Sequence, residues 1–521
     1  MSIDTTAATA ATTAGFVRLR PDDTVAVATR AHPAGAHVGV GPVGLVLRDD
    51  VPAGHKLALV DVATGGQVRK YGQVIGVASR PIQVGEHVHT HNLAFSGSAR
   101  DHSPGEGLRE YGPAAPEKAA TFQGIVRADG KVATRNYIGI ITSVNCSASV
   151  ARMVAGHFQE GSELLERFPN VDGVVALTHG SGCGMAGAGE GFELLRRTLN
   201  GYAAHPNFAA LLVIGLGCEV NQVRSLTEGF DLAPTTPMLP MTIQELGGTR
   251  ATVREATARI RELAEQANEV SRTTVPASEL ILGLECGGSD AYSGITANPA
   301  LGVAADLLVQ HGGTAILGET PEIYGAEHLL VRRAANAAVG AQLMERVRWW
   351  EEYVKAAGAS LDNNPSPGNK EGGLTTIAEK SLGAVAKGGS STLNAVYRYA
   401  EPVTAKGFVF MDTPGYDPVS VTGMVAGGAN VVCFTTGRGS VFGSKPAPCI
   451  KLCTNTETYR HMQEDMDVNC GTIIDGTSSV DEVGHEIFDL VLAVASGRRT
   501  VSEELGFGDE EFTPWQLGAV L

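Results

Sequence analysis

Apolar and polar positions follow two different rhythms along this chain. Between Phe16 and Asn92, short apolar runs such as TVAVAT, HVGV and YGQVIGVAS are broken by Gly, Pro and Asp. Alternation with a period of two and frequent turn residues are typical of short strands. We therefore predict a small all-β domain at 13–92, after a disordered Ala/Thr-rich tail at 1–12. The next stretch is rich in Gly, Pro and Ser and lacks periodicity, which predicts a linker at 93–117.

After residue 117, apolar runs alternate with amphipathic stretches. The runs NYIGIITSVN, VDGVVALTHG and AALLVIGLGCE indicate strands, and TRATVREATARIRELAEQANEV predicts a long helix. Repetition of strand, loop and helix is typical of a mainly parallel sheet. We predict one α/β domain at 118–270 and another at 276–521. The predicted fold class is therefore multidomain: a small all-β domain followed by two α/β domains with mainly parallel sheets.

Composition and charge exclude several classes of protein. Lys and Arg number 40 and Asp and Glu 56, which gives a net charge of −16. Such a surface repels phosphate groups, so we expect neither nucleic acid nor membrane as a partner. The Met1 end lacks the features of a signal peptide, and eight cysteines are too few for a disulfide scaffold. We predict a cytoplasmic protein with free thiols, and we leave open whether it forms a homo-oligomer.

A cysteine follows four of the predicted strands. These are Cys146 in SVNCSAS, Cys183 in HGSGCGM, Cys218 in GLGCEVNQ and Cys286 in LECGGSD. Ligands of open parallel sheets bind beyond the carboxyl ends of the strands, so these thiols are candidates for a shared site. The alternative is that each thiol is a small buried hydrophobic group.

Other reactive side chains also follow predicted strands. His179 could ligate a metal or shuttle a proton, or it could bond only to backbone. Glu319, in LGETPEIYG, suits a hard cation or a general base. Arg438, between two glycines in FTTGRGS, could form a bidentate pair with a substrate carboxylate, or it could cap a helix or pair with a neighbouring acid. Lys370 lies in a Gly- and Pro-rich loop that could hold an anion or serve only as a structural crossover.

Histidines gather in the predicted β domain. His87, His89 and His91 occur in EHVHTHN, and positions i, i+2 and i+4 of a strand share one face. Together with His55, in the turn PAGHKLAL, they predict a site for a divalent Fe, Mn or Zn ion. A solvated edge strand would give the same pattern.

Long motifs of this chain resemble those of the altronate/galactarate dehydratase family. The segment LRDDVPAGHKLALVDVATGGQVRKYGQVIGVASRPIQVGEHVHTHN resembles the SAF (β-clip) domain that opens these enzymes. The segments VRADGKVATRNYIGIITSVNCSA, VIGLGCEVNQ, LECGGSDAYSGITANPALG, NPSPGNKEGGLTTIAEKSLG and FTTGRGS resemble the remainder of the family. The resemblance covers nearly the whole chain and its motifs are long and specific.

The resemblance implies a hydro-lyase that acts on a sugar acid. D-Altronate would lose water across C2–C3 and yield 2-dehydro-3-deoxy-D-gluconate. The alternatives are galactarate or another hydroxy acid as the substrate, and a carbohydrate-binding scaffold as a protein without catalysis. We expect catalytic roles for His179, Cys183, Arg438, Lys370 and Glu319. We expect substrate contacts from Asn369, Asp290, Ser289 and Gly437.

The resemblance also implies activation by Fe²⁺ or Mn²⁺. Removal of the C2 proton creates an enediolate, and a cation chelating the carboxylate and a hydroxyl would stabilise that charge. The expected ligands form a mixed set of His, Cys and carboxylate groups, and the candidates are His55, His87, His89, Cys146, Cys183, Cys218 and Cys286. The alternative is an iron–sulfur cluster on some of these cysteines, with one open iron.

Overall fold

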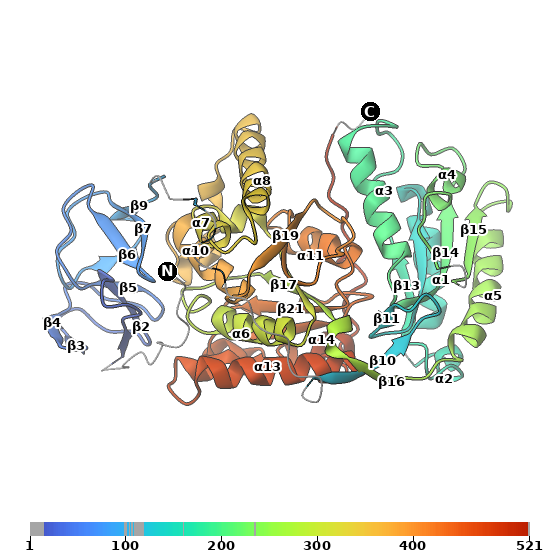
Figure 1. Cartoon of the computed structure of the whole chain (residues 1–521). Coiled ribbons are helices and arrows are strands. Elements are labelled where there is room, and N and C mark those ends of the chain that lie inside the picture. The colour runs from blue at the N-terminus through green and yellow to red at the C-terminus, as the bar shows by residue number, and fades with distance from the viewer. Residues whose placement is uncertain are drawn as a thin grey trace.

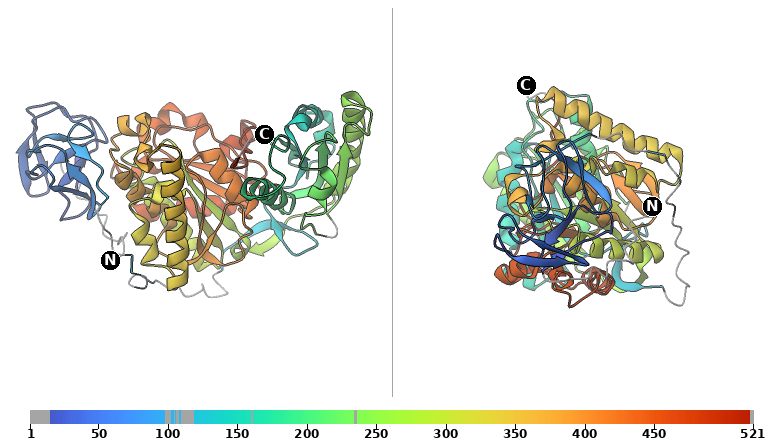
Figure 2. Two further views of the ribbon diagram at one scale, coloured as in Figure 1. Left: turned by 90° about the horizontal axis from the view of Figure 1, so that it is seen from above. Right: turned by 90° about the vertical axis from the view of Figure 1, so that its left-hand side faces the viewer.

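The chain folds into three parts arranged in a row, shown from three directions (Figures 1 and 2). The computed structural model describes residues 15–97, 102–103, 105, 108, 119–159, 161–233 and 236–518. The predicted tail at 1–12 and most of the predicted linker at 93–117 lie outside the described residues. Within these ranges, no helix is both long enough and apolar enough to cross a membrane.

The N-terminal module consists of short antiparallel strands. One sheet has the order β1 (Phe16–Val17), β2 (Val25–Ala28), β5 (Lys56–Ala58), β8 (His87–Val88). The others are formed by β3 (His37–Val40) with β4 (Val43–Val46), and by β6 (Gln67–Lys70), β7 (Gln73–Ala78) and β9 (Leu93–Ala94). In β6, Val68 and Lys70 are buried and Gln67 is exposed, as the period of two requires. The predicted all-β domain is confirmed, and its last strand lies just beyond residue 92.

The second part is built on a parallel sheet. Its strand order is β13 (Gly173–Leu177), β12 (Tyr137–Thr142), β14 (Phe208–Gly215), β15 (Met238–Thr242). The helices that follow the strands are α1 (Ala148–Ala155), α3 (Glu190–Ala203), α4 (Val223–Thr227) and α5 (Thr249–Ala267). The chain enters through β10 (Thr121–Val126) and leaves through β16 (Thr273–Pro276), and these two strands pair with each other. The predicted α/β architecture is therefore confirmed here.

The C-terminal domain contains a seven-stranded parallel sheet. The strand order is β19 (Leu393–Tyr397), β20 (Gly407–Met411), β18 (Thr314–Leu317), β17 (Ile281–Cys286), β21 (Val431–Thr436), β22 (Cys449–Cys453), β23 (Val468–Asn469). Strands β20, β21 and β22 are buried throughout and are largely apolar, as expected when both faces of a sheet are covered. The helices include α6 (Ala297–Gln310), α11 (Asp417–Ala426) and α13 (Val480–Ala495). Buried residues of α3 and α11 share one apolar cluster, so the second and C-terminal domains pack through a common core.

The C-terminal sheet has a topological switch point beside β17. From β17 the chain builds β18, β19 and β20 on one side and then returns to build β21, β22 and β23 on the other. Ligands of open parallel sheets bind at such a point, beyond the carboxyl ends of the strands. The loops after β17 and β21 are therefore where the fold favours a site.

The N-terminal module contacts the C-terminal domain through buried polar groups. Lys56 Nζ and Lys70 Nζ each donate a hydrogen bond of 2.9 Å to the carboxylate of Glu379, in α10 (Ile377–Ala384). Backbone approaches backbone nearby, because a Cβ on Gly373 would collide with the carbonyl of Gly54, and Gly373 has a φ of +94°. These contacts fix the module against the helix that follows the Gly- and Pro-rich loop.

Candidate active site

The loops after β17 and β21 contact each other beside the helix Pro367–Glu371, which the N-terminal module touches, and we call this junction the crevice. The backbone N–H groups of Gly437 and Arg438 donate hydrogen bonds of 3.1 and 2.9 Å to the carbonyl of Gly288. A Cβ on Gly437 would collide with the carboxyl group of Asp290, so only glycine fits there. The glycines of ECGGSD and FTTGRGS are thus explained by the close approach of the two loops.

Arg438 presents a partly free guanidinium at this crevice. Its Nη2 lies 3.4 Å from Oε2 of Glu371, and the two side chains are 48% and 72% exposed. An ion pair this exposed contributes little to stability and exchanges easily for another partner. Lys370, half-buried, precedes Glu371 in α9 (Pro367–Glu371). The predicted loop at Lys370 therefore contains a short helix, which brings a second cation to the region of Arg438.

Histidines of the N-terminal module contact the same helix. The Nδ1 atom of His55 lies 2.9 Å from Nε2 of His87, and the rings of His55 and His89 are 4.9 Å apart. His55 Nε2 donates a hydrogen bond of 3.1 Å to the carbonyl of Glu371, and His89 Nε2 donates one of 2.9 Å to that of Lys370. Burial and neighbouring cationic groups lower the pKa of His87 to about 3 and that of His89 to about 4. These imidazoles are therefore neutral at pH 7.

Two of these histidines, His55 and His87, are spaced as adjacent ligands of a divalent transition metal, although the described residues do not bring three histidine ligand atoms within 4.8 Å of one another. Because Nε2 of His55 donates to a carbonyl, Nδ1 of its neutral ring carries the lone pair, and it points at Nε2 of His87. The 2.9 Å between these atoms matches two adjacent ligands, since metal–nitrogen bonds of ~2.1 Å at right angles put nitrogens about 3 Å apart. A backbone carbonyl on the remote N–H is the usual support of a ligating imidazole. Imidazole is a suitable ligand for iron.

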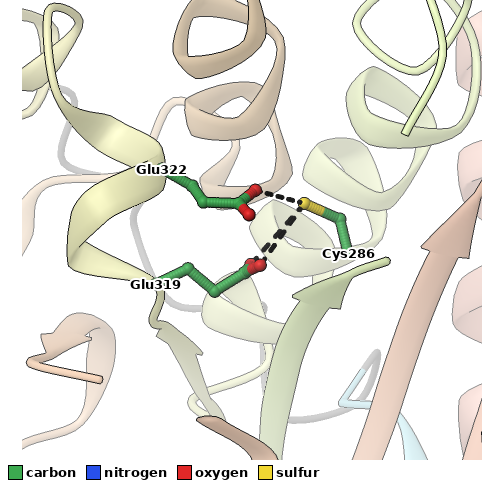
Figure 3. Close-up of side chains that lie close together, drawn as sticks. All are labelled: Cys286, Glu319 and Glu322. Atoms are coloured by element: carbon green, nitrogen blue, oxygen red, sulfur yellow. Dashed lines mark hydrogen bonds between the residues drawn. The ribbon is translucent and has the colours of Figure 1, made fainter. Parts of the chain in front are cut away.

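A second reactive group lies deeper, where β17 and β18 end (Figure 3). The thiol of Cys286 lies 3.4 Å from Oε2 of Glu322 and 3.5 Å from Oε1 of Glu319. One ligand atom from each of the three residues can be chosen so that all lie within 4.8 Å of one another. Glu319 has a φ of +63°, a strained conformation that concentrates at functional sites.

This deeper group fits a divalent cation poorly. Lys387 Nζ contacts the carboxylate of Glu319, and Lys380 Nζ lies 2.7 Å from Oε1 of Glu322. Two ammonium groups already neutralise the two carboxylates and would repel an added cation. Burial raises the pKa of Cys286 far above its usual range, so the thiol keeps its proton. The group is therefore better described as a buried ion-pair network than as a metal site.

Asp417 joins the deeper group to the crevice, and the sequence interpretation missed it. A Cβ on Gly287 would collide with Oδ2 of Asp417, so the carboxylate lies directly against the loop after β17. Burial, together with the charges of Glu319 and Glu322, raises the pKa of Asp417 to about 7. A carboxyl group with this pKa can give or take a proton at neutral pH. An Asp before Pro at the first turn of a helix has an ordinary structural explanation, so no motif pointed to it.

The predicted substrate contacts are already engaged with protein partners. Asn369 Nδ2 donates a hydrogen bond of 2.8 Å to the carbonyl of Ser289. Asp290 accepts hydrogen bonds of 2.9 Å from the hydroxyl of Thr454 and 3.0 Å from that of Ser293, and it is buried. These residues hold the walls of the crevice together, and we interpret them as positioning residues. This differs from the direct contacts predicted for Asn369, Asp290 and Ser289.

His179 and Cys183 belong to the second domain, in loops beyond β13, whereas Arg438 and Lys370 belong to the C-terminal domain. His179 is buried, and its Nε2 donates a hydrogen bond of 2.9 Å to the carbonyl of Thr142, as in the backbone-bonded alternative. Burial lowers the pKa of His179 to about 4. The structure does not bring these two residues to the crevice, because they follow strands of a different sheet.

The four cysteines grouped from the sequence are also divided between two domains. Cys146, Cys183 and Cys218 are exposed in the second domain, and Cys286 is buried in the C-terminal domain. The expectation of one shared site for all four is therefore corrected. Each of the four cysteines does lie at the end of a strand or in the loop after it, as the sequence predicted. That position does not tell which sheet the strand joins.

Three family models match consecutive parts of the chain. They describe the altronate/galactarate dehydratase SAF domain at residues 14–96, the D-galactarate dehydratase/altronate hydrolase second domain at 124–268, and the D-galactarate/altronate dehydratase C-terminal domain at 277–520. Their boundaries follow the three parts seen in the fold.

Individual proteins are similar over almost the full length. The chain is 38% identical to galactarate dehydratase (L-threo-forming) of Escherichia coli strain K12 over 506 residues, 96% of either chain. It is 35% identical to altronate dehydratase of the same strain over 498 residues, 94% of this chain and 97% of that protein. It is 33% identical to altronate dehydratase of Bacillus subtilis strain 168 over 511 residues, 97% and 99% of the two chains.

Proposed function

Because this chain belongs to the altronate/galactarate dehydratase family and is a sugar-acid dehydratase, we propose that its substrate is D-altronate. The products are 2-dehydro-3-deoxy-D-gluconate and water. The C2–H and C3–O bonds break, the enol formed across C2–C3 tautomerises to the 2-keto acid, and no electrons are exchanged with another reactant. The reaction is that of a carbon–oxygen lyase.

The position of Arg438 carries this proposal. Its guanidinium lies at the switch point of the C-terminal sheet, in the loop bonded to Gly288, and its present partner Glu371 is an exposed side chain. A guanidinium presents a planar fork that matches a carboxylate. Arg438 therefore binds the C1 carboxylate, and Lys370 adds a second positive charge. Both cations stabilise the negative charge that develops on the carboxylate when C2 loses its proton.

Asp417 supplies the proton for the leaving 3-hydroxyl group. Its carboxyl lies against Gly287, in the same loop that bonds to Arg438, and its pKa near 7 leaves a large protonated fraction at neutral pH. Glu319 and Glu322 are the neighbours whose charge retains that proton. Glu319 thus acts through Asp417, as a positioning residue, rather than on the substrate itself.

An Fe²⁺ or Mn²⁺ ion held by His55, His87 and His89 would stabilise the enediolate as a Lewis acid. The three rings come from the N-terminal module, and Nε2 of His55 and Nε2 of His89 bond to carbonyls of α9. Docking of the module therefore orients the imidazoles above the residues that bind the carboxylate. The buried pairs of Glu379 with Lys56 and Lys70 keep that orientation fixed.

Galactarate is the second candidate substrate. It is favoured by the 38% identity to galactarate dehydratase, against 35% and 33% to the two altronate dehydratases. The two acids differ at C6, which is a carboxylate in galactarate and a hydroxymethyl group in altronate, and also in the configuration at C5. With two cationic side chains near the crevice, Arg438 and Lys370 could each take one carboxylate of galactarate.

Turnover of a panel of aldonates and aldarates tests the assignment. The full chain would be assayed anaerobically with Fe²⁺ and with Mn²⁺, and formation of the 2-keto-3-deoxy acid would be measured. We expect the highest kcat/KM with D-altronate. A higher value with galactarate would overturn the substrate, and wild-type turnover by Arg438→Ala on the best substrate would overturn the location of the site.

A further inference from the structure

Three cysteines of the second domain differ from the others in exposure. The five remaining cysteines, Cys286, Cys433, Cys449, Cys453 and Cys470, are buried in the C-terminal domain. Cys146, Cys183 and Cys218 are exposed. Cysteine is among the most buried residue types, so three exposed thiols in loops that follow adjacent parallel strands call for an explanation.

The three loops that carry these thiols are bonded to one another. The backbone N–H of Asn145 donates a hydrogen bond of 2.9 Å to the carbonyl of Ser181, and that of Asn221 donates one of 3.1 Å to the carbonyl of Gly182. The Nδ2 atom of Asn221 donates a further bond of 3.1 Å to the carbonyl of Ser143. A Cβ on Gly182 would collide with that same carbonyl. The loops after β12, β13 and β14 therefore hold the thiols at one edge of the sheet.

The acidic and imidazole groups of this edge are used to brace the loops. Glu219 is buried and accepts hydrogen bonds of 2.6 Å from the hydroxyl of Ser143 and from the backbone N–H of Gly217. His179 is buried and donates to the carbonyl of Thr142. Neither side chain is presented at the surface as a ligand. The three thiols, by contrast, are exposed at the surface. The Nε2 atom of Gln244 lies 3.7 Å from Sγ of one of them, Cys218.

We propose that Cys146, Cys183 and Cys218 ligate an iron–sulfur cluster of the [4Fe–4S] type, whose fourth iron takes no cysteine. Among the described residues, these three do not form a group with ligand atoms within 4.8 Å of one another, as a single ion would need. A cluster distributes its thiolates over different irons, so it suits sulfurs held farther apart. The amide of Gln244 would donate to a ligating sulfur, a contact of the kind that tunes such clusters.

This centre is separate from the crevice assigned to dehydration. The three thiols belong to the second domain, and the histidines belong to the N-terminal module at the opposite end of the row of domains (Figure 1). Cys286, which the sequence grouped with them, is excluded because its thiol is buried against Glu319 and Glu322. The cluster would thus be an additional cofactor, and its presence is testable without any turnover assay.

Anaerobic reconstitution of the full chain with ferrous iron and sulfide tests the proposal. We expect about four irons and four acid-labile sulfides per chain, with a paramagnetic signal after reduction. Each of Cys146→Ser, Cys183→Ser and Cys218→Ser should lower both contents several-fold. These positions are exposed, so the variants should fold, which circular dichroism would verify.

The matched control is Cys453→Ser, because its thiol donates to the carbonyl of Asn455 at 3.3 Å and a hydroxyl can replace it. This variant should keep the iron and sulfide of the parent chain, whereas His87→Ala should keep all of the sulfide and lose at most the single iron assigned to the histidines. Iron and sulfide that persist in the three exposed-cysteine variants would overturn the assignment. Binding of zinc without sulfide, or failure of the parent chain to retain iron and sulfide, would overturn it as well.

Discussion

Lys56 of the N-terminal module donates a buried hydrogen bond of 2.9 Å to Glu379 of α10, across 323 residues of sequence. Lys70 donates to the other oxygen of the same carboxylate, and all three side chains are at most 1% exposed. Two cations from one module thus share one anion of another domain. Because the histidines lie in the same module, this ion pair controls how the imidazoles face the crevice.

Glu379→Gln should strongly destabilise the docked module. The substitution leaves two buried ammonium groups without an anion, a change that costs about 3–5 kcal/mol in the free energy of unfolding. Denaturant unfolding monitored on the whole chain measures this loss. Glu371→Gln is the matched control, because its ion pair with Arg438 is exposed and should contribute less than ~1 kcal/mol. Equal stability of the two variants would contradict the role given to Glu379.

The same carboxylate predicts a pH dependence of stability. Although burial opposes ionisation, the charges of Lys56 and Lys70 lower the pKa of Glu379 to about 2 from an ordinary value of 4.5. Its stabilisation is therefore complete above about pH 4.5 and decreases as the pH falls toward 2. The difference in unfolding free energy between wild type and Glu379→Gln should narrow over this interval. A difference that stays constant from pH 7 to pH 3 would argue against ionised Glu379 as its source.

Sequence patterns identified the strands and the loops that follow them, but not how distant segments meet. Arg438 was predicted beyond a strand end because a fully apolar run precedes it, and the structure has it there. The contact of His89 with the carbonyl of Lys370 spans 281 residues, and no local pattern encodes such a pairing. Periodicity also cannot assign a strand to a sheet, which is why Cys286 was grouped with cysteines of another domain.

Asp417→Asn should remove most of the turnover and its alkaline dependence. With a pKa near 7, the Asp417 carboxyl donates its proton below pH 7 and is increasingly deprotonated above it. The kcat of the wild type should therefore fall above about pH 7, approaching tenfold per pH unit, whereas the variant should show a low kcat without this limb. Kinetics with the best substrate across about pH 5.5–9, an interval that spans the titration of one carboxyl group with a pKa near 7, measure both effects. A wild-type profile that falls below pH 7 instead would assign Asp417 as a base.

Removal of metal should abolish activity, and His87→Ala should weaken metal binding. Chelator-treated enzyme should regain turnover when Fe²⁺ or Mn²⁺ is added back. Loss of the His87 imidazole should lower the affinity for Mn²⁺ by at least about 10- to 100-fold, because loss of a residue that only hydrogen-bonds to a metal ligand already has an effect of that size. Paramagnetic titration with Mn²⁺ measures affinity directly. His37→Ala, which removes an exposed histidine of the same module, is the control and should bind normally. Full activity of the metal-free enzyme would exclude the requirement.

Arg438→Lys should weaken catalysis while leaving the fold intact. Lysine keeps the positive charge but loses the planar fork that holds a carboxylate through two hydrogen bonds. Loss of such a charged pair costs on the order of 2–5 kcal/mol, by analogy with buried pairs at interfaces. Since the crevice is partly open and the charge is retained, we expect the lower end, a fall in kcat/KM of at least about tenfold.

The matched control for this substitution is Arg80→Lys. Arg80 is 45% exposed and pairs with Glu86 at 3.1 Å, so it resembles Arg438 in exposure and in its carboxylate partner, but it lies in the N-terminal module. Both variants should melt at the temperature of the wild type, because neither guanidinium is buried. Only Arg438→Lys should change kcat/KM on the preferred sugar acid. If the two variants were equally active, the substrate carboxylate would have to bind elsewhere, and Arg438 would be left with its exposed pair to Glu371.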